Sequence, residues 1–345
     1  MAGANPALLT LVREYRGFTQ AELADRAGVT QGYISKFENE ILPIPAEMME
    51  TIARALDWPV GFFSRSDKVY GLGSTCLYHR KQATLPVSTL RSVQAKANVL
   101  RIGVLPLLED VELVAEHPFP VMDVDEYGSP VIIAQMVRAV WRLPLGPVQN
   151  LVAAVESAGG IIWRVPFGTR QMDAVSHWST PHPILLLNSE ASGDRVRFSL
   201  AHEIGHLVMH RIPNPDMERE ADHFAAELLM PEREIRSELM RLDLVKAAQL
   251  KAYWKVSMAA LVMRARDLGV ITPGRAKGLF VELSRMGFRT REPVEIPIEE
   301  PTVLESLVDL HRTEHGYTGA ELVVLSGTPE DVFLGGKRPP LRAVK

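Results

Sequence analysis

The stretch FSLAHEIGHL, residues 198–207, decides the fold of the central part of this chain. It contains the pattern His-Glu-x-x-His, with His202 and His206 four residues apart. On a helix, residues i and i+4 lie one turn apart on the same face, so the two imidazoles can bind one metal ion. Glu203 is rotated to the side of that face, where it can act as a general base toward a water molecule.

The residues around the histidines indicate a buried helix. Ala201, Ile204 and Val208 form an apolar face, and Gly205 leaves room for the close approach of another segment. A chance match to the pattern is expected in roughly one or two of a hundred chains of this length. Two surface histidines that fall together by accident are therefore the weaker interpretation.

A catalytic zinc site needs a third protein ligand and an open position. The segment MEREADHFAAELLMP, residues 217–231, predicts a second helix with Phe224 on its apolar face. Glu220 lies four residues before Phe224, at the flank of this face, so we predict that Glu220 is the third ligand of a Zn²⁺ ion. Glu218 and Glu227 lie further from the face by the same reasoning. His223 is an alternative ligand, although a supporting or solvent-facing role suits it better.

The chain has one cysteine, Cys76, among 345 residues. This excludes a disulfide framework and a thiolate metal cluster, so any metal must be held by histidines and carboxylates. The stretches RVRFSLAHEIGHLVMH (195–210) and EREADHFAAELLMP (218–231) resemble the ImmA/IrrE family of metallopeptidases. In that family the pattern Glu-Ala-Asn-x-Phe-Ala supplies the third ligand, which here falls on Glu220, with Asp222 in place of the usual Asn.

The resemblance covers residues 130–270 and implies a zincin-like α+β domain whose active-site helix packs under a small sheet. It also implies peptide-bond hydrolysis and a regulatory protein as substrate. Apolar runs at residues 161–165 and 184–187 predict two strands, and the stripe from Met258 to Leu268 predicts a late helix. The group that would stabilise the oxyanion stays open, with His177, His182 and Tyr253 as candidates by residue type.

The first 65 residues predict a bundle of short helices. The pattern from Phe18 to Asn39, FTQAELADRAGVTQGYISKFEN, resembles the repressor-type (Xre-like) helix-turn-helix. Thr19 and Glu22 form a capping-box pattern at the start of the first of its two helices. The second helix would present short polar side chains to the major groove of DNA. The residues predicted to contact DNA are Gln20, Thr30, Gln31, Tyr33, Ser35 and Lys36.

Within this set, Gln31 and Lys36 can reach purine edges, whereas Ser35 and Gln20 suit phosphate contacts. The alternative is a helical docking or dimerisation module without DNA binding. The small Gly32 and the charge of residues 1–65, with six basic against eight acidic residues, support this alternative. A weaker helix-turn-helix-like pattern at about residues 246–268 is interpreted as packing within the peptidase domain.

The net charge of −4 argues against a protein that coats nucleic acid nonspecifically. Residues 66–101 nevertheless hold six basic residues and one acidic residue. They form either a phosphate-contacting surface or, more simply, a solvated helix face around residues 88–103. We therefore predict four regions: a helix-turn-helix domain (1–65), a basic connector (66–125), a zincin-like domain (126–288) and a C-terminal extension without a recognisable motif (289–345).

The leading hypothesis is a zinc-dependent endopeptidase with a DNA-binding domain that regulates transcription, in a stress or prophage programme, by cleaving a repressor. The alternatives are a non-proteolytic DNA-binding regulator whose zinc domain senses a ligand or partner, and the antitoxin of a two-gene module. An operator-like DNA site and a homodimer on it are expected partners, because repressor-type domains usually bind paired half-sites. The chain shows neither a signal peptide nor a membrane-spanning apolar run, so the expected location is the cytoplasm.

Overall fold

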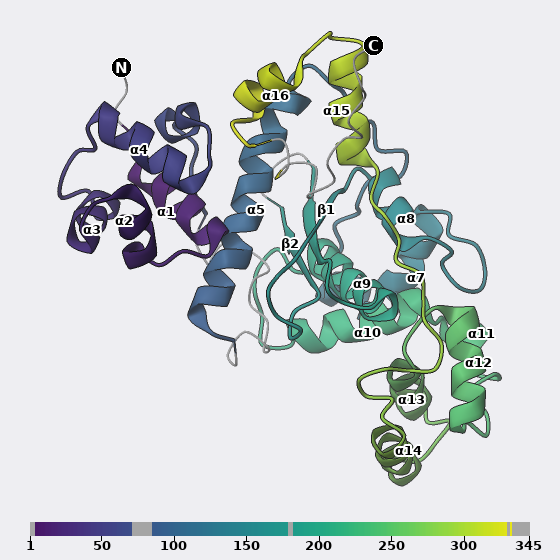
Figure 1. The fold of residues 1–345 in the computed structure, drawn as a ribbon. Coiled ribbons are helices and arrows are strands. Elements are labelled where there is room, and N and C mark those ends of the chain that lie inside the picture. Colours follow the sequence, from purple (N-terminus) through teal and green to yellow (C-terminus); the bar gives the residue numbers. More distant parts are fainter. Residues whose placement is uncertain (1–3, 71–84, 179–181, 330–331, 333–345) are drawn as a thin grey trace, which may run out of the picture.

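The computed structural model describes residues 4–70, 85–178, 182–329 and 332. A bundle of short helices at the N-terminal end lies beside one long helix, α5 (Val87–Leu108), as Figure 1 shows. A small sheet follows on the other side of α5, and further helices cover the far face of the sheet. The fold is α+β, as the sequence predicts.

The N-terminal bundle has the predicted succession of helices. They are α1 (Pro6–Arg16), α2 (Gln20–Ala27), α3 (Gln31–Glu38) and α4 (Ala46–Leu56), followed by the 3₁₀ turn η1 (Val60–Ser64). The capping box between Thr19 and Glu22 is present at the start of α2. Gly17 and Gly28 end α1 and α2 with φ of 74° and 68°, a conformation that glycine adopts without steric cost.

Helix α5 is a core helix, which differs from both interpretations of the basic connector. Arg101 is 6% exposed, and its guanidinium lies over the ring of Tyr70. Burial lowers the pKa of Lys96. Both faces of α5 are covered, because α1 packs on one side and the sheet, α15 and α16 pack elsewhere along it. Cys76, Arg80 and Lys81 lie outside the described residues.

The described residues form a sheet of three strands in the order β1–β3–β2. Strands β1 (Ile161–Val165) and β3 (Ile184–Asn188) were predicted and are parallel, whereas β2 (Ala174–His177) is antiparallel to β3 and forms an edge. Alternate side chains face opposite cores: Ile161 and Trp163 pack toward α5, and Ile162 packs toward the helices on the other face. Both faces are therefore buried, so the strands read as continuous apolar runs.

The helices beyond the sheet hold the predicted metal-binding residues. Three short helices precede these helices in the chain or pack around them: α6 (Val124–Tyr127), α7 (Pro130–Val140) and α8 (Leu151–Ser157). Helix α9 (Gly193–Met209) lies against the sheet, and α10 (Met217–Leu229) packs on α9 and α7. A β-carbon on Gly205 would lie 3.1 Å from Phe224 Cδ1 and 3.3 Å from Ala221 Cα, so this glycine permits the close contact of α9 and α10.

A small helical unit projects at the lower right of Figure 1. It consists of α11 (Glu232–Ile235), α12 (Leu244–Trp254), α13 (Met258–Asp267) and α14 (Pro273–Arg285). The chain turns between α12 and α13 at Lys255, whose φ is 57°, and Ser257 caps α13. This unit contains the second helix-turn-helix-like pattern, and α13 packs within the larger hydrophobic core as predicted.

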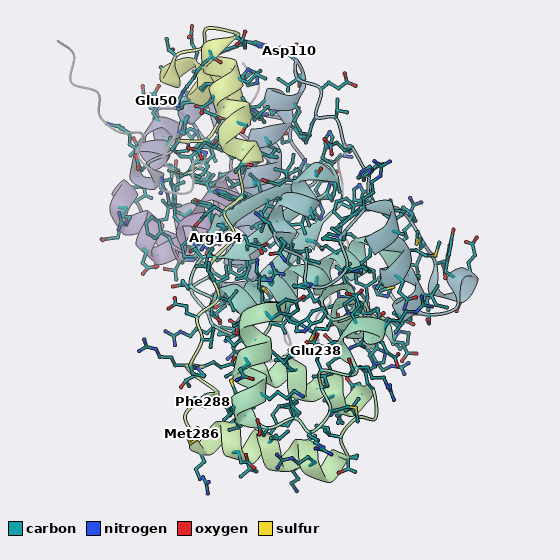
Figure 2. All side chains as sticks on the ribbon, turned by 90° about the vertical axis from the view of Figure 1, so that its right-hand side faces the viewer. Glu50, Asp110, Arg164, Glu238, Met286 and Phe288 are labelled. Carbon is teal, nitrogen blue, oxygen red and sulfur yellow. The ribbon has the colours of Figure 1, made fainter. Side chains whose placement is uncertain are left out.

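Residues 286–302, here called the strap, connect α14 to α15 (Val303–Thr313). Figure 2 shows the chain leaving α14 near Met286 and Phe288 and rising past Arg164 toward α15. Two strap carboxylates accept backbone hydrogen bonds at helix starts: Glu292 from Met258 of α13, and Glu299 from Leu151 and Val152 of α8. The strap therefore caps two helix N-termini, because its carboxylates accept hydrogen bonds from backbone N–H groups that have no partner within the helix.

The last described helix, α16 (Gly319–Ser326), packs against α5, and α15 packs against β1 and α5. The described part of the region without a recognisable motif thus completes the core on the α5 side of the sheet. Among the residues described, no helix is both long and apolar enough to cross a membrane.

Candidate metal centre

Helix α9 places His202, Glu203 and His206 at the junction of the sheet and α10. Glu203 is 2% exposed and His206 is 1% exposed, because α9 is covered by the sheet on one side and α10 on the other. The Nε2 atoms of His202 and His206 are 3.0 Å apart and point at one another. The helical spacing therefore brings both rings to one point, as the sequence indicated.

The carboxylate beside this histidine pair is Glu218, where the sequence favoured Glu220. Glu218 Oε1 lies 3.4 Å from His206 Nε2, and Glu218 Oε2 lies 3.7 Å from His202 Nε2. Among the described residues, His202, His206 and Glu218 form the one group of three potential ligands within 4.8 Å of one another.

Helix geometry explains the difference between the two glutamates. At 100° per residue, Glu218 lies roughly 60° to one side of Ala221, whereas Glu220 lies roughly 100° to the other side. Asp222 shares the side of Glu218, and its carboxylate contacts His202. Glu220 instead faces the C-terminal end of α9, where its Oε2 lies 3.0 Å from His210 Nε2.

The three side chains lie close enough to hold one tetrahedral metal ion. Zinc ligands about 2.0–2.1 Å from the ion in tetrahedral geometry are roughly 3.3–3.4 Å from one another. The two Nε2 atoms are 3.0 Å apart, and each lies near a different oxygen of Glu218, at 3.4 Å for His206 and 3.7 Å for His202, so the observed separations bracket this value. Two imidazoles and one carboxylate are also a donor set that suits zinc and leaves one position open. The residues present therefore fit the ion that the sequence implied.

The outer nitrogen of each imidazole has a partner that sets its tautomer. His202 Nδ1 lies 2.8 Å from Asp222 Oδ1, so Nδ1 carries the hydrogen and Nε2 keeps its lone pair for a metal. Burial lowers the pKa of His202, but the carboxylates of Asp222, Glu218 and Glu203 outweigh it and raise the pKa.

His206 is held through a second histidine that the sequence analysis did not single out. His210 Nε2 faces the Glu220 carboxylate, which only accepts, so His210 carries its hydrogen on Nε2. Its Nδ1, 2.9 Å from His206 Nδ1, then accepts a hydrogen bond from His206. Burial and the neighbouring His206 lower the pKa of His210, which favours this neutral form. The spacing HxxxH after His206 was the available signal, since it continues the same helix face.

Glu203 is held by the edge strand. The hydroxyl of Ser176 on β2 donates to Glu203 Oε2 at 2.6 Å, and Ser176 is fully buried. The four residues of β2 are too short a run to read as a strand from sequence, so this contact was not predicted. It fixes the orientation of the Glu203 carboxylate beside the histidine pair.

A cavity of about 980 Å³ opens in front of these residues. His202, Glu203 and Glu218 line it, together with residues 171–174 at the start of β2 and the first turns of α13. Phe198, Met230 and Met263 give it apolar walls. This volume lies at the upper end of the range of about 300–1,000 Å³ for ligand sites.

None of the three residues suggested for oxyanion stabilisation lines this cavity. His177 lies against Tyr70 with the ring centroids 5.6 Å apart, His182 Nδ1 contacts the Gly159 carbonyl, and Tyr253 is 55% exposed on α12. Burial, with a further effect of Arg101, lowers the pKa of His177 to about 4. His223, suggested as a supporting or solvent-facing residue, does line the cavity.

The predicted DNA-contacting residues lie on or beside α3. Thr30, Gln31 and Lys36 are exposed, whereas Tyr33 and Ser35 are half-buried, and Tyr33 packs edge-on against Phe37. Gln31 donates to Gln20, which in turn donates to Glu38, and Glu38 also binds Arg13. This chain of hydrogen bonds joins the start of α3 to α2 and α1.

Comparison with known families agrees with this arrangement. Residues 158–266 match the family model Peptidase_M78, described as the IrrE N-terminal-like domain. Within this segment the chain is similar to the IrrE N-terminal-like domain. Residues 10–63 match the model of a helix-turn-helix domain, so the resemblance drawn from the sequence is confirmed for both parts. A search of the curated proteins found no match to the chain.

The segment that matches the IrrE N-terminal-like domain runs from just after α8 to α13 and includes the sheet, the histidine pair and Glu218. Asp222, which replaces the usual Asn of the resembled pattern, still presents an oxygen to His202 Nδ1. The substitution therefore preserves the hydrogen bond acceptor and adds a negative charge beside the metal centre. The family indicates a metallopeptidase, and the helix-turn-helix match indicates DNA binding.

Proposed function

We propose that this protein is a zinc-dependent endopeptidase that cleaves a transcriptional regulator, and that its helix-turn-helix domain binds an operator-like DNA site. The observation that carries the proposal is the convergence of His202, His206 and Glu218 beside the buried Glu203, at the wall of a large cavity. The family matches support a peptidase domain behind a DNA-binding domain.

The chain's own residues suit peptide hydrolysis. His202 and His206 would hold the ion through Nε2, since each Nδ1 hydrogen is directed to Asp222 or His210. Glu218 would complete the set. A bound zinc ion would act as a Lewis acid that polarises the scissile carbonyl and lowers the pKa of the attacking water. Glu203 takes the proton of that water and passes it to the leaving amine, and the Ser176 hydroxyl keeps the carboxylate oriented for both transfers.

The substrate would enter as an extended chain beside β2. Among the described residues, β2 pairs with β3 on one side, and its first residue, Ala174, lines the cavity. An edge strand offers backbone groups that bind an extended peptide. His223 is the imidazole that would meet the oxyanion, because it lines the same cavity as His202, Glu203 and Glu218.

The test is cleavage by the purified zinc-loaded protein of a degenerate peptide library and of the regulator encoded beside it. We expect Glu203→Gln to keep one equivalent of zinc and to lose cleavage by at least about a hundredfold, because a general base contributes typically 10²–10⁴-fold. Equal activity of the Glu203→Gln variant and the wild type would refute the mechanism. Zinc binding with full DNA affinity and no cleavage would favour the alternative of a non-proteolytic regulator or antitoxin.

A further inference from the structure

The cavity at the metal centre continues beyond it. A second cavity of about 870 Å³ shares four lining residues with the first: Asp194, Arg195, Ser257 and Ala259. Its far wall is made by α14 and by strap residues 288–292 and 294–296. The first turn of α13 therefore lies between two adjoining cavities, so the cavity of the metal centre extends past α13 toward α14.

A third hollow of about 450 Å³ follows on the face of α14. It shares Phe280, Ser284 and Arg289 with the second cavity and Arg266 with the first. Because they share these lining residues, the three hollows adjoin one another around α13 and α14, and the part beyond the first cavity is here called the α14 groove. Figure 2 places Phe288, a lining residue, at the lower end of the molecule where the strap begins.

The charge of the α14 groove is positive, although the whole chain carries −4. Arg266, Lys277 and Arg289 line the third hollow, and none of its lining residues is acidic. Within the described part of the chain, Lys277 and Arg289 have no ion pair, whereas Arg266 pairs with its neighbour Asp267.

In the second cavity the charges are largely neutralised in place. Lys251 is 2% exposed and binds both Asp194 and Glu292, which leaves one negative charge in this cluster. Arg195 binds Asp173 at 2.9 Å. The remaining charges are those of Arg289 and Arg291 against Glu295. The excess of positive charge thus increases along the path away from the metal centre, and the apolar Phe280 and Val281 lie beside it.

We propose that the α14 groove binds the part of the polypeptide substrate beyond the scissile bond, and that it selects a segment with acidic side chains interspersed with apolar ones. This inference about the substrate rests on the proposed function, because the groove adjoins the cavity of the metal centre. The first two cavities would each hold a drug-sized ligand, so their union suits a polymer. A chain that advances about 3.3 Å per residue would reach Arg289 and Lys277 several residues after the cleavage point.

A DNA ligand fits the same groove less well. The pattern of α12 and α13 resembles a helix-turn-helix, but a recognition helix must present its N-terminal residues to base edges. Here Ser257, Ala259 and Ala260 line the cavity of the metal centre.

The experiment compares five peptides on the zinc-loaded full chain. A quenched fluorescent peptide selected from the degenerate library is used alone, or extended at either end by (Glu-Ala)₃ or by (Gln-Ala)₃. We expect one acidic extension to lower KM roughly tenfold relative to its Gln counterpart, as two or three exposed ion pairs would. The difference should shrink as salt is raised.

The variant Lys277→Glu/Arg289→Glu should abolish the preference for the acidic extension and leave cleavage of the short peptide unchanged. The matched control is Arg233→Glu/Arg241→Glu, which reverses two exposed cations that line none of the three hollows. It should keep the preference. An equal loss on short and extended peptides in the first variant, or no preference for acid at either end in the wild type, would overturn the inference.

Two outcomes separate this inference from the function on which it rests. If the wild type cleaves no library peptide, the proposed function fails and the groove loses its substrate. In the second outcome, the wild type cleaves the short peptide, and the Lys277→Glu/Arg289→Glu variant loses only its binding to a random-sequence DNA duplex. The groove would then bind DNA, and the inference that it binds a polypeptide would be refuted.

Discussion

At the residue scale, two glutamates on one helical turn have different tasks. Glu218 meets both imidazoles, whereas Glu220 contacts His210 and accepts from Asn214 Nδ2 at 3.3 Å. The motif alone gives no means of choosing between them, since both carboxylates flank the buried face of α10. What decides the choice is the direction from which α9 crosses α10, and that depends on the contact at Gly205.

This division of tasks predicts different metal affinities. Glu218→Ala should lose zinc binding in a competition assay with a chelator, because only two protein ligands remain. Glu220→Ala should still bind one equivalent, with an affinity weaker by at most about 10–100-fold, because Glu220 orients His210, the hydrogen-bond partner of the ligating His206, and such partners contribute on this scale. Glu232→Ala, an exposed carboxylate paired with Arg236 on the surface, serves as control. Full affinity in Glu218→Ala, or complete loss in Glu220→Ala, would contradict the assignment.

His177 predicts a pH-dependent stability. Burial and Arg101 lower its pKa to about 4, while an unfolded histidine titrates near 6.5. The unfolded state therefore binds more protons between these values, and stability falls as the pH decreases from about 6.5 to 4. The contribution is on the order of 2–3 kcal/mol. Urea unfolding of wild type and His177→Gln at pH 7.5 and pH 4.5 should show a smaller loss in the variant. Parallel losses would exclude His177 as the source.

At the scale of elements, the strap depends on one glycine. A β-carbon on Gly193 would lie 2.4 Å from the Ile296 carbonyl oxygen and 2.8 Å from that of Pro297. Gly193→Ala should therefore displace the strap and lower the free energy of unfolding by about 1–3 kcal/mol, as overpacking does. Gly278→Ala on α14 meets no atom within 4 Å and should be neutral or slightly stabilising. Calorimetry of both variants measures the difference between their melting temperatures. Equal melting temperatures would show that the strap can shift without a loss of stability.

Helices with a clear apolar stripe were predictable from sequence, and elements defined by their neighbours were not. The capping box of α2, the strands at 161–165 and 184–187 and the stripe of α13 all carry local signals. The burial of helix α5 was not predicted, because Lys96 and Arg101 suggested a solvent-exposed face. The guanidinium of Arg101 lies inside because it stacks on Tyr70 and donates to the Lys68 carbonyl. Such a partner, about 30 residues earlier in the chain, leaves no trace in helical periodicity.

At the scale of the whole molecule, the helix-turn-helix domain shares its core with the peptidase part. Trp58 in the N-terminal bundle and Trp163 in β1 belong to one hydrophobic cluster, which α5 bridges. Arg65 also donates to the carbonyl of Leu325 in α16, so the described C-terminal helix is tied to the end of the bundle. Domain boundaries drawn from motifs do not reveal such a shared core, since each motif reports only its own residues.

A shared core predicts that the two functional parts unfold together. The fluorine NMR signals of Trp58 and Trp163 in 5-fluorotryptophan-labelled protein should disappear at the same urea concentration, because separating the bundle would expose the apolar face of α5. Trp254, in the second cluster, tests whether α12 to α14 follow the same transition. An earlier midpoint for Trp58 alone would mean that the bundle opens independently. DNA binding would then stabilise only the bundle against unfolding. If the parts unfold in one transition, DNA binding should instead raise the unfolding midpoint of the metal centre as well.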